Sequence, residues 1–320
     1  MKALRFENDC LKLAEISKPN FETEALVRVL QSGICNTDLE IVKGYANFSG
    51  TIGHEFVGIV EESKDAPSLI GKRVVGEINT GCGNCESCQK GDARHCPTRT
   101  VLGIVGRDGA HADYLKLPSR NLLQVPENVS NEQAVFTEPL AAAFGITEQV
   151  EILPETRVAI IGDGKLGILC ALSLALKSRN VFLIGKHKEK LRLTKNKNVE
   201  TVLVEDAKKL GKSFDVAVEA SGAESGFEAA LDLLKPRGKL VLKSTFHGAA
   251  KWSAWHVVVD EITIVGSRCG RFAPALELLK NREIDVENLI SEQFNLSRGV
   301  KAINRAGEKG VMKVILSMTN

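Results

Sequence analysis

Aromatic side chains are scarce in this chain of 320 residues: together they make up 5% of it, and tyrosine and tryptophan occur twice each. Such a chain has little material for the platforms on which proteins stack single-stranded nucleic acid. An excess of one charge is missing as well, because 42 Lys and Arg stand against 40 Asp and Glu, a formal net charge of +2. A near-neutral chain has no overall basic field to attract nucleic acid or a membrane surface. The sequence therefore predicts neither kind of partner.

A long apolar run is missing too. The longest spans residues 166–176, and its eleven residues are too few to cross a bilayer. Charges occupy residues 1–7, where a secretory signal needs an apolar stretch. Hydrophobic residues at 43% and charged residues at 26% are ordinary for a globular protein. We therefore expect a folded cytoplasmic protein, and its length indicates about two domains.

Cysteine, by contrast, occurs eight times, and four of the eight lie within residues 82–96. In a chain without a secretory signal, such a cluster more often binds metal than forms disulfides. The spacing Cys-x2-Cys-x2-Cys-x7-Cys lets four thiolates surround one Zn²⁺ tetrahedrally, and a closed four-sulfur shell is structural. An iron–sulfur cluster would need three residues before the last cysteine instead of seven, and free thiols are the remaining alternative. We predict a structural zinc ion held by Cys82, Cys85, Cys88 and Cys96.

The first 120 or so residues have the pattern of short strands. Apolar, β-branched runs at 24–30, 56–61 and 72–76 are bounded by Gly, Pro, Asp or Ser, which is typical of β-structure. The period then changes, and a helix is expected over 131–143 with Ser130 or the next residue as its cap.

Residues 157–265 alternate between strand and helix patterns. This alternation indicates a parallel sheet with helices on both faces. Strands are expected at 157–161, 181–184, 201–204, 216–218, 239–242 and 263–265, helices at 166–177, 188–196, 223–234 and 274–280, and a last strand at 311–316.

A glycine-rich motif, Gly-x-Gly-x-x-Gly, follows the first of these strands and opens the first of these helices, which is the context that dinucleotide binding requires. The first glycine permits a tight turn, the second lets a diphosphate approach the backbone, and the third allows the helix to pack closely on the strand. A purely structural turn is the alternative. Asp163 is expected to point to solvent, because its charge would repel a diphosphate. The predicted diphosphate-binding residues are Gly162, Gly164, Lys165, Leu166 and Gly167.

The end of the second strand distinguishes the two nicotinamide dinucleotides. An NAD site places Asp or Glu there, about twenty residues after the glycines, to hold the ribose 2′-hydroxyl. This sequence has Gly185 instead, followed by Lys186, His187 and Lys190. The missing carboxylate and the following cations predict a preference for NADP(H) over NAD(H). The alternative is a solvated basic start of a helix.

Two stretches late in this region leave their roles open. Ser267 and Arg268 are candidate cofactor contacts, with a plain linker as the alternative. Trp252 and Trp255 are candidates for a subunit interface, with ordinary core packing as the alternative.

Three scattered residues complete the candidate chemistry: Cys35, His54 and Glu138. Taken singly, each has an ordinary explanation, because a lone cysteine is usually a small core hydrophobe and a His-Glu pair is usually a solvated turn.

Taken in order, the motifs resemble the zinc-dependent medium-chain dehydrogenase/reductase family, the alcohol and polyol dehydrogenases. The resemblance implies a GroES-like β-rich catalytic domain, residues 1–138 plus 269–320, and a doubly wound parallel Rossmann domain, residues 139–268. The matching stretches are Gly33-Ile-Cys35-Asn-Thr37-Asp38, Gly53-His54-Glu55-Phe-Val-Gly58, Gly81-Cys-Gly-x-Cys-x2-Cys-x7-Cys96 and Thr137-Glu138-Pro139-Leu140.

The resemblance also implies a second, catalytic zinc ion. Cys35 and His54 are then its ligands, Glu55 is the nearby carboxylate that ligates or exchanges with water, and Glu138 stands where the family carries Cys or Glu. A Glu at that position is similar to the polyol, threonine and sugar dehydrogenases. Asp38 is expected to orient His54, with a turn or cap residue as the alternative.

Thr37 stands where this family carries the hydroxyl that bonds the alcohol oxygen and passes on its proton, and a hydroxyl suits this because it donates and accepts at once. Glu40 stands where the classical members carry a relay histidine, so the exit route of the proton is left open.

The expected function is a zinc-containing oxidoreductase that interconverts an alcohol, of the polyol or sugar-like kind among others, and its carbonyl with NADP(H). The alternatives are an NAD-dependent member of the family and a non-catalytic nucleotide- and zinc-binding protein. A zinc-ribbon nucleic-acid binder is disfavoured by the near-zero net charge. A homodimer or homotetramer is expected.

Overall fold

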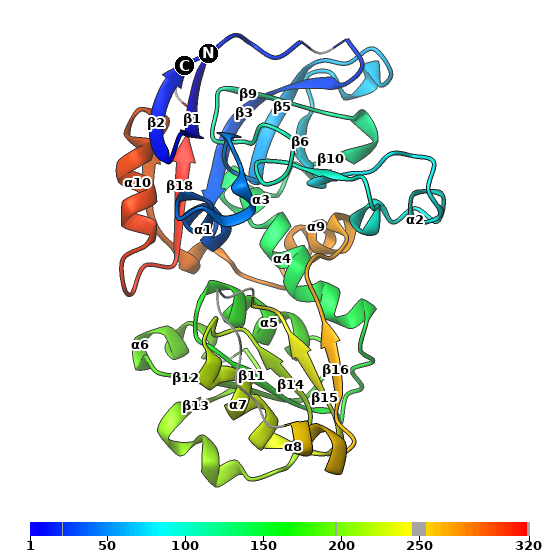
Figure 1. The fold of residues 1–320 in the computed structure, drawn as a ribbon, viewed down its shortest axis with the longest axis vertical. Coiled ribbons are helices and arrows are strands. Elements are labelled where there is room, and N and C mark those ends of the chain that lie inside the picture. The colour runs from blue at the N-terminus through cyan, green and yellow to red at the C-terminus, as the bar shows by residue number, and fades with distance from the viewer. Residues whose placement is uncertain (21, 196, 245–253, 319–320) are drawn as a thin grey trace. The chain divides into compact units, whose positions relative to one another are not determined.

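The computed structural model describes residues 1–20, 22–195, 197–244 and 254–318. The chain forms two compact units (Figure 1). The first unit combines Met1–Glu138 with Phe272–Asn320, and the second is the continuous segment Pro139–Arg271. Within the described part of the chain, no helix is both long and apolar enough to cross a membrane.

The second unit is built on a parallel six-stranded sheet with the order β13-β12-β11-β14-β15-β16. All of its strand pairs are parallel, which confirms the doubly wound architecture expected from the alternating pattern. The first strand, β11, lies inside the sheet, so the glycine-rich motif begins at an interior strand end. The strands are β11 (Arg157–Ile161), β12 (Asn180–Gly185), β13 (Val199–Leu203), β14 (Phe214–Glu219), β15 (Leu234–Leu242) and β16 (Thr263–Gly266).

Helices α5 and α7 connect strands of this sheet and bury their apolar sides against it. Helix α5 packs on β11 and β12, and α7 packs on β11, β14 and β15. Phe182, Phe214 and Phe227 belong to the apolar core that forms there. The helices of this unit are α5 (Lys165–Ala175), α6 (Lys188–Leu191), α7 (Glu224–Leu233) and α8 (Ala254–Val259).

The first unit is β-rich, as expected. Its largest sheet has the order β10-β6-β5-β3-β18-β17, and β9 pairs with β3 outside this path. A second sheet has the order β2-β1-β4, and β7 pairs with β8. The strands are β1 (Lys2–Glu7), β2 (Cys10–Glu15), β3 (Ala25–Ile34), β4 (Gly50–Thr51), β5 (Glu55–Glu62), β6 (Arg73–Gly76), β7 (Asn79–Thr80), β8 (Thr100–Val101), β9 (Tyr114–Leu117), β10 (Leu122–Gln124), β17 (Ile290–Asn295) and β18 (Lys313–Ser317).

The late segment of the chain completes this sheet. Strand β18 pairs antiparallel with β3, so that Val314 lies opposite Ile34. The blue and red strands of Figure 1 meet there. This pairing brings residues from the two ends of the chain to one site. The helices of the unit are α1 (Asn36–Val42), α2 (Glu86–Gln89), α3 (Asn131–Val135), α9 (Phe272–Lys280) and α10 (Gly299–Ala306), and α4 (Thr137–Phe144) leads from this unit into the second.

Three expected helices differ from the structure. The helix expected over 131–143 is interrupted at Phe136, because Pro139 lacks the N–H that a continuous helix would need to bond residue 135. The helix expected over 223–234 ends at Leu233, and Leu234–Leu242 continues as the strand β15. The helix expected at 188–196 has only the four α-helical residues Lys188–Leu191.

Candidate metal centres and nucleotide site

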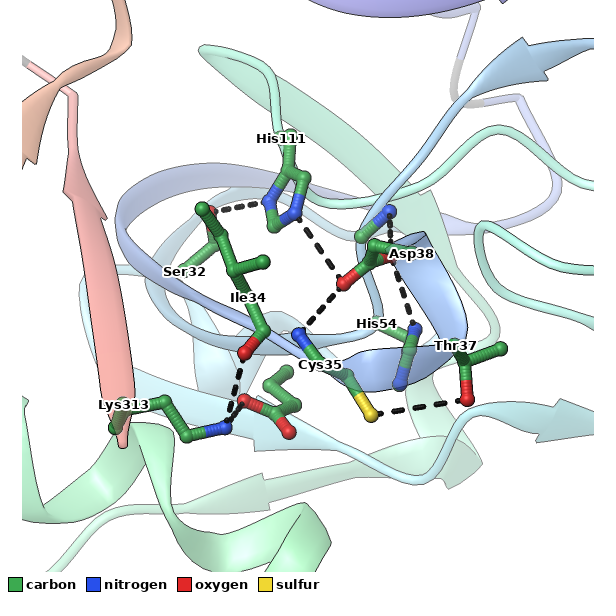
Figure 2. A network of polar contacts seen from close by, with 10 residues as sticks. Ser32, Ile34, Cys35, Thr37, Asp38, His54, His111 and Lys313 are labelled. Carbon is green, nitrogen blue, oxygen red and sulfur yellow. Dashed lines mark hydrogen bonds and ion pairs between the residues drawn. The ribbon is translucent and has the colours of Figure 1, made fainter. Parts of the chain in front are cut away.

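The first candidate metal centre begins where β3 ends. Cys35 follows this strand directly and is the N-cap of α1, with extended backbone angles of φ −98° and ψ 161°. Thr37 lies in the first turn of the same helix, and its Oγ1 is 3.7 Å from Cys35 Sγ. The short helix therefore holds a thiol and a hydroxyl side by side (Figure 2).

His54 and Glu55 reach the same place from the start of β5. Gly53 has a φ of +98°, and a Cβ at this position would collide with the ring of His111. Only glycine meets both conditions at low cost. Within the described residues, ligand atoms of Cys35, His54 and Glu55 all lie within 4.8 Å of one another.

The carboxylate of Asp38 contacts several groups of this centre. Its buried carboxylate accepts the backbone N–H of Cys35 at 2.8 Å and that of Gly53 at 3.1 Å. One of its oxygens lies 3.6 Å from His54 Nδ1, and the other lies 3.6 Å from His111 Nε2. Figure 2 shows the His54 ring between Asp38 and the Cys35 sulfur. Asp38 thus caps α1 and lies next to His54, and its orienting role toward that ring stays a prediction.

The charges around Asp38 also shift its pKa. Burial raises the pKa of Asp38, but the neighbouring His54 and His111 outweigh burial and hold the pKa well below its usual range. Burial lowers the pKa of His54, and the charges of Asp38 and Cys35 raise it well above the ordinary value. His111 is held in turn by Ser32, whose Oγ lies 2.7 Å from His111 Nδ1.

Lys313 is a component of this centre that the sequence reasoning missed. Its ammonium group is fully buried, forms an ion pair with the equally buried Glu55 and donates to the carbonyl oxygen of Ile34 at 3.4 Å. Space for the pair exists because residue 33 is glycine: a Cβ there would collide with Glu55 and lie 2.7 Å from Val135. No local motif marks this lysine, since it reaches Glu55 through the pairing of β18 with β3.

The residues of this centre fit a zinc ion. Thiolate, imidazole and carboxylate are the side chains that bind zinc in proteins. Glu55 Oε1 is buried and accepts no hydrogen bond from the described residues, an arrangement that is costly unless a cation satisfies it. Glu138 lies in the first turn of α4 and is not among the donor atoms that gather within 4.8 Å.

The second candidate metal centre contains the four clustered cysteines. Their sulfur atoms lie within 4.8 Å of one another. Backbone N–H groups point at two of the sulfurs: that of Cys82 reaches Cys96 Sγ, and that of Cys85 reaches Cys82 Sγ, each at 3.4 Å. The first of these bonds is the main cause that lowers the pKa of Cys96 to about 6. This polarity favours the thiolate of Cys96, the form that binds metal. Cys88 differs, because the backbone bond from Gly83, which lowers its pKa, is outweighed by burial and the neighbouring cysteines, which raise the pKa to about 11.

Glycine again makes room for the cluster. A Cβ on Gly81 would lie 2.5 Å from Cys88 Sγ and 3.3 Å from Cys96 Cβ. All eight cysteines of the chain are described, and none of them forms a disulfide. The geometry and the donor set fit one zinc ion.

The glycine-rich motif of the second unit joins β11 to α5. Gly162 has a φ of +122°, and Gly164, the N-cap of α5, faces open space. A Cβ on Gly167 would collide with the carbonyl oxygen of Gly162. The turn therefore needs two of its glycines for its own geometry, and the third leaves room in front of the helix N-terminus. Lys165 and Leu166 form the first turn of α5.

Asp163 does not point to solvent, so this expectation was wrong. The residue is 8% exposed, and its Oδ2 accepts the backbone N–H groups of Lys186 and His187, each at 2.7 Å. His187 Nδ1 lies 3.1 Å from the same oxygen. These donors offset the cost of burying the carboxylate, which the local sequence could not show.

The other cofactor candidates lie around the carboxyl ends of the strands in this unit. Gly185 ends β12, Lys186 is exposed, and His187 and Lys190 are half-buried. Ser267 follows β16 and is buried, and Lys243 donates to the carbonyl oxygen of Arg268 at 3.0 Å.

The two tryptophans have different outcomes. Trp255 is 55% exposed and stacks on His256, so the alternative of core packing was wrong for this residue. Trp252 lies outside the described residues.

Comparisons with known proteins identify the family to which this fold belongs. The family model of the alcohol dehydrogenase GroES-like domain matches residues 22–127, and that of the zinc-binding dehydrogenases matches residues 166–281. A sorbitol dehydrogenase of Halalkalibacterium halodurans is 28% identical over 91% of this chain and 90% of its own length.

Two solved structures, each 25% identical, are similar over nearly their whole length. One is described as a zinc-binding dehydrogenase of Sinorhizobium meliloti 1021 bound to NADP, with a TM-score of 0.90 over 99% of this chain and 98% of the other. The second is an alcohol dehydrogenase of Escherichia coli CFT073 complexed with NADH, with a TM-score of 0.91 over 99% of both chains. Fold and site thus define a dehydrogenase built from a GroES-like and a Rossmann unit. The chain belongs to the zinc-dependent medium-chain dehydrogenase/reductase family and is an oxidoreductase.

Proposed function

We propose that this oxidoreductase interconverts an alcohol, of the polyol or sugar-like kind, and its aldehyde or ketone by hydride exchange with a nicotinamide dinucleotide. The supporting observation is the meeting of Cys35, His54 and Glu55, with the Thr37 hydroxyl beside the sulfur. The similarity to a sorbitol dehydrogenase supports a polyol-like substrate.

In this proposal, Cys35, His54 and Glu55 hold a zinc ion, with Glu138 as a further ligand. When bound, zinc supplies Lewis-acid polarisation of the substrate oxygen. Asp38 keeps the His54 ring in place through Nδ1, which leaves Nε2 for the metal.

Thr37 carries the proton in the proposed reaction. Its hydroxyl accepts the proton of the alcohol while it donates its own onward, and it lies in the first turn of α1, two residues after Cys35. Glu40, on the same helix, forms an ion pair with Lys43 at 2.9 Å. Because residue 40 is a glutamate, the next proton acceptor after Thr37 is not an imidazole at this position.

Substitution of the ligands tests this function. His54→Ala and Cys35→Ala should abolish turnover of a panel of polyols followed by nicotinamide absorbance, while the fold and dinucleotide binding persist. Cys10→Ser, which removes an exposed thiol, is the matched control and should leave turnover unchanged. Near-normal activity of either ligand variant would exclude a catalytic zinc at this site.

A non-catalytic nucleotide- and zinc-binding protein is the competing function. It would bind a single zinc ion, at the four cysteines, and would show no turnover with any member of the panel.

The second unit is proposed to prefer NADP(H). The argument rests on Lys186, His187 and Lys190, which offer charge-assisted hydrogen bonds to a 2′-phosphate at the end of β12. Gly162, Gly164, Lys165, Leu166 and Gly167 are proposed to hold the diphosphate, with Ser267 and Arg268 as further cofactor contacts. Direct comparison of kcat/KM with NADP and NAD tests the preference.

We also propose a homodimer or homotetramer. The supporting observation is a set of exposed apolar side chains on α8 and β16, namely Trp255, Val258, Val259 and Ile264, which are 37–73% exposed. Ile264 belongs to β16, the edge strand of the six-stranded sheet, and exposed apolar edges favour association. Light scattering of the native chain and of Val258→Lys tests this. The expected cytoplasmic location stays a prediction.

A further inference from the structure

Asp163 lies at an unexpected place in the nucleotide-binding unit. It comes from the turn after β11, yet its carboxylate lies at the end of the neighbouring strand β12, where it bonds Lys186 and His187. Three donors reach the carboxylate: two backbone N–H groups at 2.7 Å and His187 Nδ1 at 3.1 and 3.2 Å from its two oxygens. Because a carboxylate has about four acceptor positions, it retains capacity for a further donor.

The side chain of Asp163 lies directly against Gly185. A Cβ built on Gly185 would lie 2.5 Å from both Cβ and Oδ2 of Asp163, and the three atoms nearest to it all belong to Asp163. The side chain of Asp163 therefore fills the volume that a side chain at the strand end would occupy. In NAD sites, that position carries the Asp or Glu that holds the ribose 2′-hydroxyl.

We infer that Asp163 supplies, from the glycine-rich turn, the ribose-reading carboxylate that the end of β12 lacks, and that it determines the balance between NAD(H) and NADP(H). The inference rests on the proposed nucleotide site. A 2′-hydroxyl donates to the carboxylate, whereas a 2′-phosphate meets its negative charge.

Two opposing groups of charges then act on the 2′ position. Lys186, His187 and Lys190 attract a phosphate, and Asp163 repels it. The hydrogen bonds that Asp163 accepts keep it ionised: burial raises the pKa of this carboxyl, but the bonds from His187 and Lys186 outweigh burial and lower it. Asp163 therefore favours the binding of NAD(H). It reduces the preference for NADP(H) over NAD(H) that the basic residues create.

Calorimetric titration of the full chain with NADP⁺ and with NAD⁺ tests this without relying on turnover. Asp163→Asn removes the charge but keeps an oxygen that accepts the two backbone N–H groups. The ratio of the two dissociation constants should shift toward NADP⁺ by roughly 10- to 100-fold, the effect of one hydrogen bond to a charged group.

Asp215→Asn is the matched control. Asp215 lies on β14 and also accepts a backbone N–H at 2.7 Å, from Arg157 at the start of β11. The variant therefore removes an equal charge near the end of β11 that is opposite to Asp163. The ratio should not change in this variant.

An exchange variant keeps the test decisive if Asp163→Asn folds poorly. Asp163→Gly combined with Gly185→Asp returns the carboxylate to the strand end and should bind NAD⁺ at least as tightly as the native chain. Gly185→Asp alone should lower the melting temperature, because two carboxylates would compete for one space.

The outcomes separate the two proposals. A ratio that stays within about twofold of the native value in Asp163→Asn, or an exchange variant that loses NAD⁺ binding, overturns the role of Asp163. A native chain that binds neither dinucleotide overturns the proposed function itself, and this inference with it.

Discussion

Lys313 and Glu55 form an ion pair without solvent, since neither side chain has any exposed surface. Mutual attraction in such a pair must outweigh the loss of hydration of two charges. The ammonium group gains further partners in the carbonyl oxygen of Ile34 and in the ring of Phe136, whose centroid lies 5.6 Å away. The lysine thereby holds one oxygen of Glu55, while the other remains available to a metal.

Lys313→Met should destabilise the protein strongly, because it leaves Glu55 as a buried charge without a partner. We expect a loss of about 3–5 kcal/mol in the free energy of unfolding, measured by urea denaturation. Lys313→Met combined with Glu55→Gln should recover much of the loss. Lys209→Met breaks the exposed pair with Asp206 and is the control, expected to change little. Equal stability of the single variant and the control would contradict a structural role for the pair.

The ionisation of Asp163 predicts a dependence of stability on pH. Its pKa is lower in the folded than in the unfolded state, so its stabilising contribution is present above the unfolded value of about 3.9. The contribution is lost as pH falls through the folded value. Asp163→Asn should therefore be less stable than the native chain at pH 7, and the gap should narrow as pH falls below about 3.9. Urea denaturation at pH 7 and below about pH 3.9 measures it, and a constant gap would show that the charge is not the cause.

At the scale of elements, the sequence predicted the parallel sheet well, because apolar runs separated by helical periods follow directly from burial on both faces of a sheet. Strand β11 has the expected bounds. The helix bounds were less predictable where Pro139 interrupts a run or where β15 begins at Leu234 without a turn.

The residues of the candidate sites also differ in how well the sequence predicted them. Cys35, His54 and Glu55 were predictable because their local motifs are distinctive. Asp163 and Lys313 were not, because their roles depend on a neighbouring parallel strand and on a strand pairing across 279 residues. Local sequence carries no record of such long-range partners.

The glycines of the nucleotide turn should respond differently to alanine. Gly167→Ala forces a Cβ against the carbonyl oxygen of Gly162, so we expect a clear loss of stability, on the order of 1–3 kcal/mol. Gly164→Ala has open space in the protein alone, so the fold should persist while dinucleotide affinity falls. Melting curves and calorimetry separate the two effects. Equal melting temperatures for both variants would contradict the close packing of α5.

At the scale of the whole molecule, both candidate metal centres belong to the first unit, and the residues proposed to bind the dinucleotide belong to the second. Metal should stabilise the first unit and cofactor the second, because a ligand that binds only the folded state raises the stability of that state.

Metal analysis of protein purified without chelator should approach two zinc equivalents. Cys85→Ser should lose one of them together with stability, because a structural zinc ion contributes its binding energy to folding. A chelator should abolish turnover but leave dinucleotide binding in place. Iron with visible charge-transfer absorption would contradict the assignment of the four cysteines to zinc.

The chain leaves the first unit after Glu138 and returns to it at Phe272. A ribosome therefore completes the Rossmann unit while the GroES-like unit still lacks the strands β17 and β18. Lys313, the counter-ion of Glu55, is synthesised 258 residues after it, so Glu55 has no counter-ion through most of translation. A message that stops before β18 would yield a nucleotide-binding unit joined to an unfinished metal centre.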